Sequence, residues 1–366
     1  NDPTQVSVLG SAVYSLLQRY TLEANLRADG SSLFGQHNKW GLFPSVSTTW
    51  NVDKEPFFAT LFPTLSLWKM RMGYGTSGNQ ASIESYYSLN LVRPTGIISY
   101  QGLPKTVLGL YRNTNPDLKW ERTLSTNIGV DFTALRGRID LSADYYIKNT
   151  DNLLLDITKA PSIGVTTSRE NIGEVENKGF EMRLRTIPIQ NKDWQWSIGF
   201  TYSYNKNKIK KISNALREQN EKNLAKGGVA PLPVYEEGQS LTAIKVVPSA
   251  GIDPITGNEV FIKRDGSYTF VYDPNDKVVF GDTTPFGNGS LSSYLTYREF
   301  SMGASLRYSF GGAVYNQTLA SKVEGADPRY NADERVFNDR WKQVGEQTAY
   351  KRISDSSVPM QTSRFV

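Results

Sequence analysis

The chain lacks several residue types, and each absence removes a class of protein. Its 366 residues include no cysteine and only one histidine, His37. Disulfide frameworks, thiolate catalysis and zinc-thiolate sites are therefore excluded, and acid/base or metal chemistry near neutral pH is disfavoured. We predict that the chain is not an enzyme and binds no metal or cofactor. His37 has no partner motif, which indicates a solvated or packed side chain.

Long apolar runs are also missing. Mean hydropathy is −0.44, and no stretch approaches the roughly 20 apolar residues that a membrane helix needs. Any membrane-spanning structure must then consist of strands. The net charge of +5 is mild, and the basic residues are not gathered in one run. This distribution argues against nucleic acid as a partner.

Apolar and polar side chains alternate in segment after segment. The clearest example runs from Tyr20 to Ala28, where every second residue is polar or charged. Successive side chains of a strand point to opposite faces, so one face of such a strand is apolar and the other carries charge. About ten segments, each near the length of a tilted bilayer-spanning strand, show this pattern: 5–16, 20–29, 42–51, 65–75, 120–132, 138–149, 177–186, 194–205, 289–298 and 300–310.

The ends of these segments and the connections between them carry two further regularities. Aromatic residues stand at both ends of 194–205 and 300–310, as in the interfacial girdles of membrane barrels. Outer-membrane barrels have short periplasmic turns and long extracellular loops. We therefore predict an all-β fold, an antiparallel transmembrane β-barrel with long extracellular loops. The short connections lie at 17–19, 133–137, 187–193, 52–64 and near 299, and the long ones at 30–41, 76–119, 150–176, 206–288 and from 311 onward.

Alternation alone leaves other architectures open. A soluble β-sandwich also alternates between inside and outside. Open sheet edges cannot lie in lipid, so ten strands must either close on themselves or be completed by strands outside the chain. We expect the chain to be an internal segment of a longer protein, because strand-like sequence begins by Val6 and the chain stops in a polar stretch.

Seven motifs, in this order along the chain, closely resemble the signature of SusC/RagA-type TonB-dependent outer-membrane transporters, the nutrient importers of Bacteroidetes. Several contain turn formers at strand ends, where Gly and Asn are favoured. Trp120, in the third motif, is predicted to be an interfacial anchor. The motifs are 26–35 (LRADGSSLFG) with 40–47 (WGLFPSVS), 72–80 (MGYGTSGNQ), 115–121 (NPDLKWE), 174–181 (EVENKGFE), 250–258 (AGIDPITGN), 280–285 (FGDTTP) and 338–341 (NDRW).

The resemblance implies a larger protein in the bacterial outer membrane. Family members carry an N-terminal extension, a TonB box and a plug inside a 22-stranded barrel, and residues 1–366 resemble the middle and later barrel alone. We expect one partial barrel domain without plug or closing strands. The resemblance also implies TonB, outer-membrane lipid and a SusD-like surface lipoprotein as partners, with glycan or oligopeptide as cargo and a dimer of transporter–lid pairs. A passive porin and a soluble glycan-binding β protein remain alternatives.

Candidate contact residues fall into two groups. Loop tyrosines are candidates for contacts with cargo or lid, although packing within each loop is the alternative: Tyr86, Tyr87, Tyr100, Tyr111, Tyr235, Tyr268 and Tyr272. The charged members of alternating segments are predicted to face the lumen, where contacts with the plug are the alternative to cargo contacts: Glu23, Arg27, Lys69, Arg71, Asp140, Asp144, Glu181, Arg183 and Arg185.

Five aspartates crowd the connection 206–288, and carboxylates of this kind are calcium ligands. Their spacing does not fit an EF-hand loop, and each lies beside the Gly, Pro or Asn that turns prefer. We therefore predict turn formation rather than a metal site. The residues are Asp253, Asp265, Asp273, Asp276 and Asp282.

Overall fold

The computed structural model describes residues 4–80, 83, 91–112, 115–158, 167–171, 173–225, 233–327 and 329–353. The chain divides into two compact units. The first comprises Asn1–Leu216 with Gly287–Ser309, and the second Arg217–Phe286 with Phe310–Val366. Within the described ranges, no helix is both long enough and apolar enough to cross a membrane.

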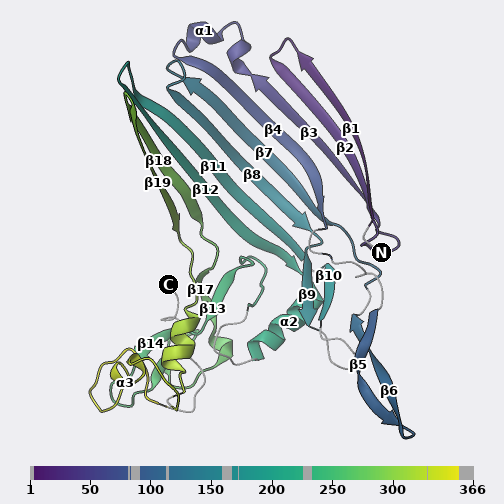
Figure 1. Cartoon of the computed structure of the whole chain (residues 1–366), viewed down its shortest axis with the longest axis vertical. Helices are drawn as coiled ribbons and strands as arrows, with labels where there is room; N and C mark the ends of the chain where they lie inside the picture. Colours follow the sequence, from purple (N-terminus) through teal and green to yellow (C-terminus); the bar gives the residue numbers. More distant parts are fainter. Residues whose placement is uncertain are drawn as a thin grey trace. The chain divides into compact units, whose positions relative to one another are not determined.

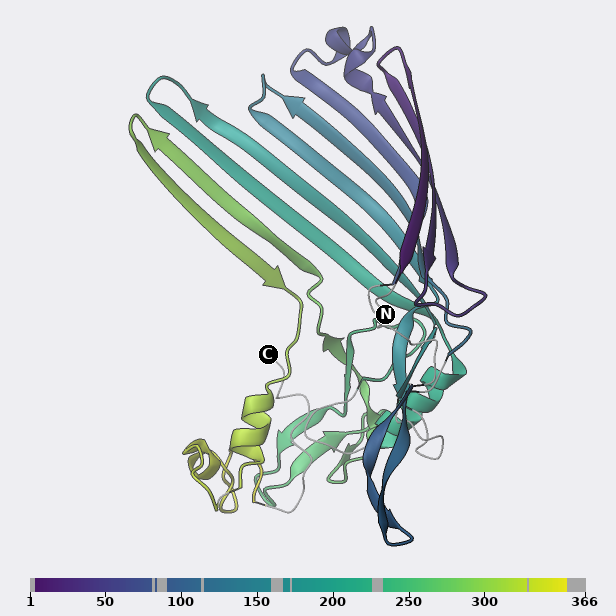
Figure 2. The ribbon, with the colours of Figure 1, turned by 45° about the vertical axis from the view of Figure 1, so that its right-hand side comes forward.

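One curved, ten-stranded antiparallel sheet forms most of the first unit (Figures 1 and 2). Each strand pairs with the sheet strand that precedes it along the chain, so β1 and β19 are the two edges. All ten strands predicted from alternation are confirmed. They are β1 (Gln5–Leu16), β2 (Tyr20–Ser31), β3 (Trp40–Asn51), β4 (Leu65–Asn79), β7 (Glu121–Ala134), β8 (Ile139–Asp151), β11 (Gly173–Gln190), β12 (Trp194–Ile212), β18 (Gly287–Tyr297) and β19 (Phe300–Phe310).

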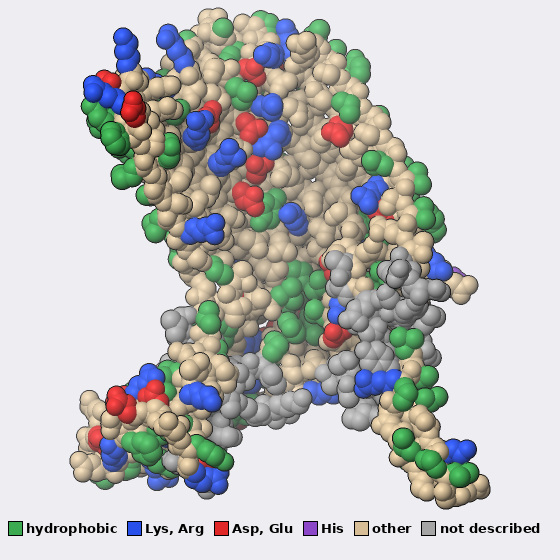
Figure 3. All heavy atoms as spheres, in the orientation of Figure 1, with side chains coloured by type: hydrophobic (Ala, Val, Ile, Leu, Met, Phe, Trp, Pro, Cys, Tyr) green, Lys and Arg blue, Asp and Glu red, His purple; other side chains and the backbone are tan. Residues whose placement is uncertain are grey.

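The two faces of this sheet differ in chemistry, and the register assigns residues to them because directly paired residues share a face. Val8, Ala28 and Leu42 form one row of the apolar face. Its large side chains are exposed, with 62% of Val8 and 60% of Leu42 accessible. The opposite face is the charged face, and Figure 3 shows Lys, Arg, Asp and Glu side chains gathered over the middle of the sheet. An apolar band on the outside and a polar inside are the pattern of a membrane barrel.

Short elements interrupt the connections of the first unit, and alternation did not predict them. The connection after β3 contains the 3₁₀ turn η1 (Val52–Lys54) and the short helix α1 (Phe58–Leu61). Between β4 and β7 the chain forms the hairpin of β5 (Leu91–Tyr100) and β6 (Leu103–Arg112). A second small hairpin, β9 (Leu154–Thr158) with β10 (Thr167–Asn171), lies between β8 and β11.

The buried core of the first unit joins two of the seven motifs, 26–35 with 40–47 and 115–121. Phe34 and Leu118 are 1% and 0% exposed, and Trp120 stacks on Phe34 at 4.3 Å between ring centroids and meets Phe43 edge-on at 5.6 Å. The Trp120 indole Nε1 donates to the Lys39 carbonyl. The prediction of Trp120 as an interfacial anchor is therefore wrong: the indole is only 8% exposed because aromatic rings cover it.

The second unit contains short strands and helices. β13 (Ala243–Val246) pairs with β17 (Val278–Asp282), and β14 (Ser249–Ile252), β15 (Glu259–Ile262) and β16 (Tyr268–Thr269) form a three-stranded sheet. The helical elements are α2 (Asn214–Ala225), whose first three residues belong to the first unit, the 3₁₀ turn η3 (Pro274–Asp276), the π-helical turn η4 (Leu319–Glu324) and α3 (Arg335–Asn338).

Two further motifs meet in this unit. Arg340 is buried and donates to four backbone carbonyls, including Glu324 at 2.7 Å and Val336 at 3.0 Å. Its neighbour Trp341 donates from Nε1 to the Pro254 carbonyl and covers Gly257, where a Cβ would lie 2.4 Å from the indole ring. These residues hold the loops of the second unit together, so both motifs are scaffold features.

Glu55, in the connection between β3 and β4, contacts residues at the turn between β1 and β2 and at the end of β3. Its contacts predict that the stability of the protein depends on pH. Its carboxylate accepts from the Tyr20 hydroxyl at 2.6 Å and from Trp50 Nε1 at 3.0 Å, and Arg19 lies at 3.4 Å. The Tyr20 hydrogen bond, followed by the Trp50 bond, lowers the pKa of Glu55. A lowered carboxyl pKa contributes stability above the pKa of the unfolded chain, and that stability is lost as the pH falls through the folded pKa.

We expect Glu55→Gln to lower the melting temperature of the full-length protein in detergent at pH 7. The difference from the wild type should shrink as the pH falls below about 4, because the wild-type carboxyl then becomes protonated as well. Thermal unfolding across this pH range measures the effect. Glu299→Gln, in the exposed turn between β18 and β19, is the control. A constant difference at every pH would contradict the assigned role.

Candidate functional site

The charged face carries an ion-pair network that joins β4, β7 and β8. Arg71 donates from Nε to Asp131 at 2.8 Å and from Nη2 to Asp144 at 3.1 Å. The Ser142 hydroxyl donates to Asp131 at 2.7 Å. These charged side chains are between 22% and 35% exposed, so water screens them only in part. One cation therefore bridges carboxylates on two neighbouring strands.

Glycines open the path for such bridges. Gly129 lies between Arg71 and Asp144 in one row of the register, and a Cβ there would be 2.3 Å from Asp144 Oδ1 and 2.8 Å from Arg71 Nη2. Gly179 has the same role beneath Tyr146, whose hydroxyl is hydrogen-bonded to Asn205. In both places a long side chain passes over the glycine of the neighbouring strand and contacts a residue of the strand beyond it.

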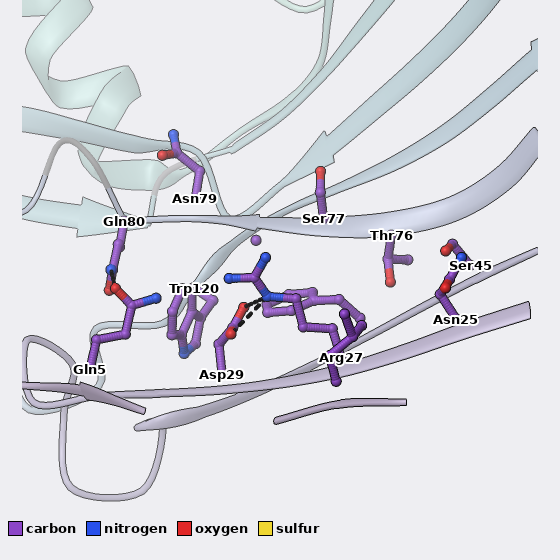
Figure 4. Close-up of a pocket in the computed structure, with 13 residues that line it drawn as sticks. Gln5, Asn25, Arg27, Asp29, Ser45, Thr76, Ser77, Asn79, Gln80 and Trp120 are labelled. Atoms are coloured by element: carbon purple, nitrogen blue, oxygen red, sulfur yellow. Dashed lines mark hydrogen bonds and ion pairs between the residues drawn. The ribbon is translucent and has the colours of Figure 1, made fainter. Parts of the chain in front are cut away.

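A pocket of about 670 Å³ lies on the charged face beside β1–β4 and is shown in Figure 4. Apolar side chains of Leu9, Phe43 and Trp120 line part of it. Gly78 makes room for the Phe43 ring, since a Cβ at Gly78 would lie 2.2 Å from it. The polar lining consists of amides and hydroxyls, with one ion pair: Gln5, Asn25, Ser45, Thr76, Ser77, Asn79, Gln80, Arg27 and Asp29.

In the ion pair of this pocket, Arg27 contacts Asp29 through Nε. Both carboxylate oxygens of Asp29 lie 2.8 Å from Arg27 Nε, and the terminal nitrogens of the guanidinium point into the pocket in Figure 4. Arg27 is 52% exposed at its side chain, whereas Asp29 is 8% exposed. The charges cancel, but the outer end of the guanidinium stays available to donate to a ligand.

All nine side chains predicted to face the lumen lie on the charged face by strand register. Three of them form contacts already described. Asp140 accepts from Thr133 at 2.9 Å and lies 3.5 Å from Arg185, and Glu23 accepts from Asn25 at 2.9 Å. Their facing the lumen of a closed barrel stays a prediction. The face also holds Lys69, Glu181 and Arg183.

The predicted tyrosines fall in different places. Tyr100 is 57% exposed at the end of β5, and Tyr268 of β16 is 69% exposed. Tyr235 and Tyr272 belong to the second unit, where burial raises the pKa of each hydroxyl. Tyr272 meets the Phe261 ring edge-on at 5.5 Å. Tyr86, Tyr87 and the side chain of Tyr111 lie outside the described residues, and cargo or lid contact stays a prediction for all seven.

Four of the five aspartates of the second unit accept hydrogen bonds from residues of their own turns, and Asp276 accepts one from another loop. Asp253 accepts from Thr256, whose hydroxyl lowers the pKa of that carboxyl, and Asp265 accepts in the same way from Ser267. The other three carboxylates accept hydrogen bonds from backbone amides: Asp273 from Asn275, Asp276 from Arg264, and Asp282 from Thr284. Among the described residues, no group of three or more His, Asp or Glu side chains could hold a metal ion.

Sequence reasoning named Arg27 but missed the rest of the pocket. Its polar residues come from β1, β2, β3 and β4 and, for Gln80, from the residue after β4, and only the strand register brings them together. A signal was present in three motifs: 26–35 with 40–47 contains Asp29 and Ser45, 72–80 ends in Asn79 and Gln80, and 115–121 contains Trp120. Motifs interpreted only as turns thus also supply the lining of a pocket.

Comparison with known proteins agrees with this architecture. The family model described as "TonB dependent receptor-like, beta-barrel" matches residues 1–345. TonB-dependent receptor P3 of Formosa agariphila is 31% identical over 344 residues, which cover 89% of this chain and 34% of that protein. TonB-dependent receptor SusC of Bacteroides thetaiotaomicron is 31% identical over 333 residues, which cover 87% of this chain and 32% of SusC.

A solved structure, that of the RagAB peptide transporter, is similar with a TM-score of 0.83 at 23% identity, covering 99% of this chain and 39% of that chain. The chain thus spans about a third of the length of the curated relatives. Family model, relatives and the two-faced sheet agree with one another. The chain belongs to the TonB-dependent receptors of SusC/RagA type and forms part of their outer-membrane β-barrel.

Proposed function

We propose that the protein containing this chain imports a nutrient, a glycan or an oligopeptide, across the outer membrane. A SusD-like surface lipoprotein delivers the nutrient, and TonB supplies the energy. The observation that carries this proposal is the two-faced sheet, because an apolar face suits lipid and a charged face suits a hydrated lumen. SusC and the RagAB peptide transporter, both similar to this chain, support it.

In this proposal residues 1–366 are one partial barrel domain that performs no bond chemistry. The relatives are named as receptors and transporters rather than enzymes, which supports this role. The edges at β1 and β19 pair with further strands of the longer protein, because unpaired strand edges are costly in lipid. Transporter and lid form pairs, and two pairs form a dimer.

Isolation of the full-length protein from its own outer membrane tests the proposal. A tagged full-length transporter is solubilised in detergent and captured, and the proteins captured with it are identified by mass spectrometry. We expect a SusD-like lipoprotein at near-equal amount, together with peptides of a plug N-terminal to Asn1. An unrelated tagged barrel from the same membrane is the control.

Uptake completes this test. Growth on the nutrient should depend both on the transporter and on TonB, and deletion of either should abolish it. A barrel captured without lipoprotein or plug, in cells whose uptake does not depend on TonB, would contradict active import and would favour a passive porin.

A further inference from the structure

We propose that the pocket beside β1–β4 binds a ring of a neutral sugar, with Arg27 and Asp29 contacting neighbouring hydroxyls. The inference rests on the proposed function and deepens it, because it names a carbohydrate as the cargo and gives a place on the barrel wall where one ring of it binds. The pocket volume of about 670 Å³ lies within the usual range for small-molecule sites.

The charge of the pocket argues for a neutral ligand. Among the described residues that line the pocket, Arg27 is the one cation and Asp29 the one anion, and they lie 2.8 Å apart. A phosphate or a carboxylate would need a positive charge that no acid cancels. A neutral sugar does not need a net charge in the pocket, so the pairing of Arg27 with Asp29 does not weaken its binding.

The hydrogen-bonding groups argue for hydroxyls. The Asp29 carboxylate accepts from Arg27 Nε and from the Ser7 hydroxyl, and it lies beside the terminal nitrogens of Arg27, which remain as donors. A hydroxyl both donates and accepts. Two adjacent hydroxyls of a sugar can therefore accept from the guanidinium and donate to the carboxylate together. The nearby hydroxyls of Ser45 and Ser77 also line the pocket and both donate and accept.

The amide of Gln80 gives a second observation. Its nitrogen donates to Gln5 Oε1 at 2.8 Å, whereas its oxygen is buried with no hydrogen-bond partner in the described part of the chain. A buried acceptor without a partner carries a desolvation cost. A ligand hydroxyl that reaches this amide after a small rotation would remove that cost.

The apolar part of the pocket suits the C–H face of a sugar ring. Phe43 and Leu9 lie beside the polar groups, and Gly41 and Gly78 leave room for the Phe43 ring, because a Cβ at either position would lie 2.5 Å or less from it. Packing of Trp120 on Phe43 at 5.6 Å fixes the ring further. A sugar presents apolar C–H groups next to its hydroxyls, which matches this division of the lining.

The test measures binding to the purified full-length transporter in detergent. The sugar probes are the methyl glycosides of glucose, galactose, mannose, xylose and N-acetylglucosamine, and trialanine is the peptide probe. Saturation-transfer NMR detects contact, and titration gives affinity. The main variant is Arg27→Lys, which keeps a charge opposite Asp29 but loses the planar fork. Ser77→Ala is a second, milder variant.

Arg298→Lys is the matched control. Arg298 pairs through Nε with Asp193 at 3.0 Å in the same manner, but it lies in the turn after β18 and does not line the pocket. We expect at least one glycoside to bind the wild type and the control equally. Arg27→Lys should weaken its affinity about tenfold, the usual effect of losing one charge-assisted hydrogen bond, and Ser77→Ala should weaken it less.

Other results overturn the inference. Equal affinity in Arg27→Lys would move sugar binding away from this pocket, and contact with trialanine but with no glycoside would replace the sugar by a peptide. Absence of contact with every probe would reject the pocket as a sugar site. None of these results affects the proposed function, which fails separately when capture yields no lipoprotein or plug and uptake does not depend on TonB.

Discussion

Replacing Gly35 by alanine is expected to destabilise the full-length transporter by about 3 kcal/mol, at the upper end of the cost of overpacking. A Cβ at this position would lie 1.7 Å from the carbonyl oxygen of Pro116 and 2.6 Å from its carbonyl carbon. Both atoms belong to the backbone, so no side-chain rotation relieves the contact. The neighbouring Phe34 and Leu118 are almost fully buried. Their packing prevents the segments around Gly35 and Pro116 from moving apart freely.

Urea unfolding of the detergent-solubilised protein measures the change, and surface expression gives a second readout. Gly73→Ala is the matched control, because no heavy atom lies within 4 Å of a Cβ placed there and a substitution without such contacts changes stability by about 0.5 kcal/mol or less. Equal stability of the two variants would mean that the segments around Gly35 and Pro116 are not in contact.

Replacing Arg71 by methionine is expected to cost about 2 kcal/mol at pH 7. The change leaves the carboxylates of Asp131 and Asp144 together on the wall without their shared cation. Removing one partner of a buried ion pair costs about 3–5 kcal/mol, and the partial exposure of these groups reduces that figure. Urea unfolding of the full-length protein again gives the free energy.

Two further variants isolate the cause. Adding Asp131→Asn to Arg71→Met removes one of the two carboxylates that have lost their cation, and it should restore part of the lost stability. Arg122→Met is the control, because Arg122 pairs with Asp151 at 3.1 Å where 54% and 36% of the two side chains are exposed, and such pairs contribute about 1 kcal/mol or less. Failure of Asp131→Asn to restore stability would show that charge is not the cause.

The sheet could be predicted from the sequence because its signal is local. In β2, for example, the polarity of each side chain indicates which face of the sheet it lies on. Polar and apolar residues alternate with a two-residue period along most of this strand. The hairpin β5–β6 gave no such signal. Val92, Ile97 and Leu108 are exposed on one face while Ile98 and Leu103 are exposed on the other, so apolar residues do not alternate with polar ones there.

The candidate site required knowledge of what lies beside each strand. Arg27 could be placed on the charged face from its polarity alone, but its neighbours Asn25, Ser45 and Ser77 look like ordinary polar residues of three different strands. Trp120 shows the same limit. Its position before a strand suited an interfacial anchor, and only the packing of Phe34 and Phe43 around it revealed a core residue.

The order of strands in the sheet also bears on how the sheet forms. Each strand pairs with the sheet strand before it, so the sheet can grow by addition at one edge, and contacts between neighbours in sequence form fastest. Three residues join β1 to β2, whereas 74 residues separate β12 from β18. Closing the longer loop costs about 3 kcal/mol more in chain entropy. The pairing of β18 with β12 is therefore expected to be a slower step in forming the sheet than the pairing of β2 with β1.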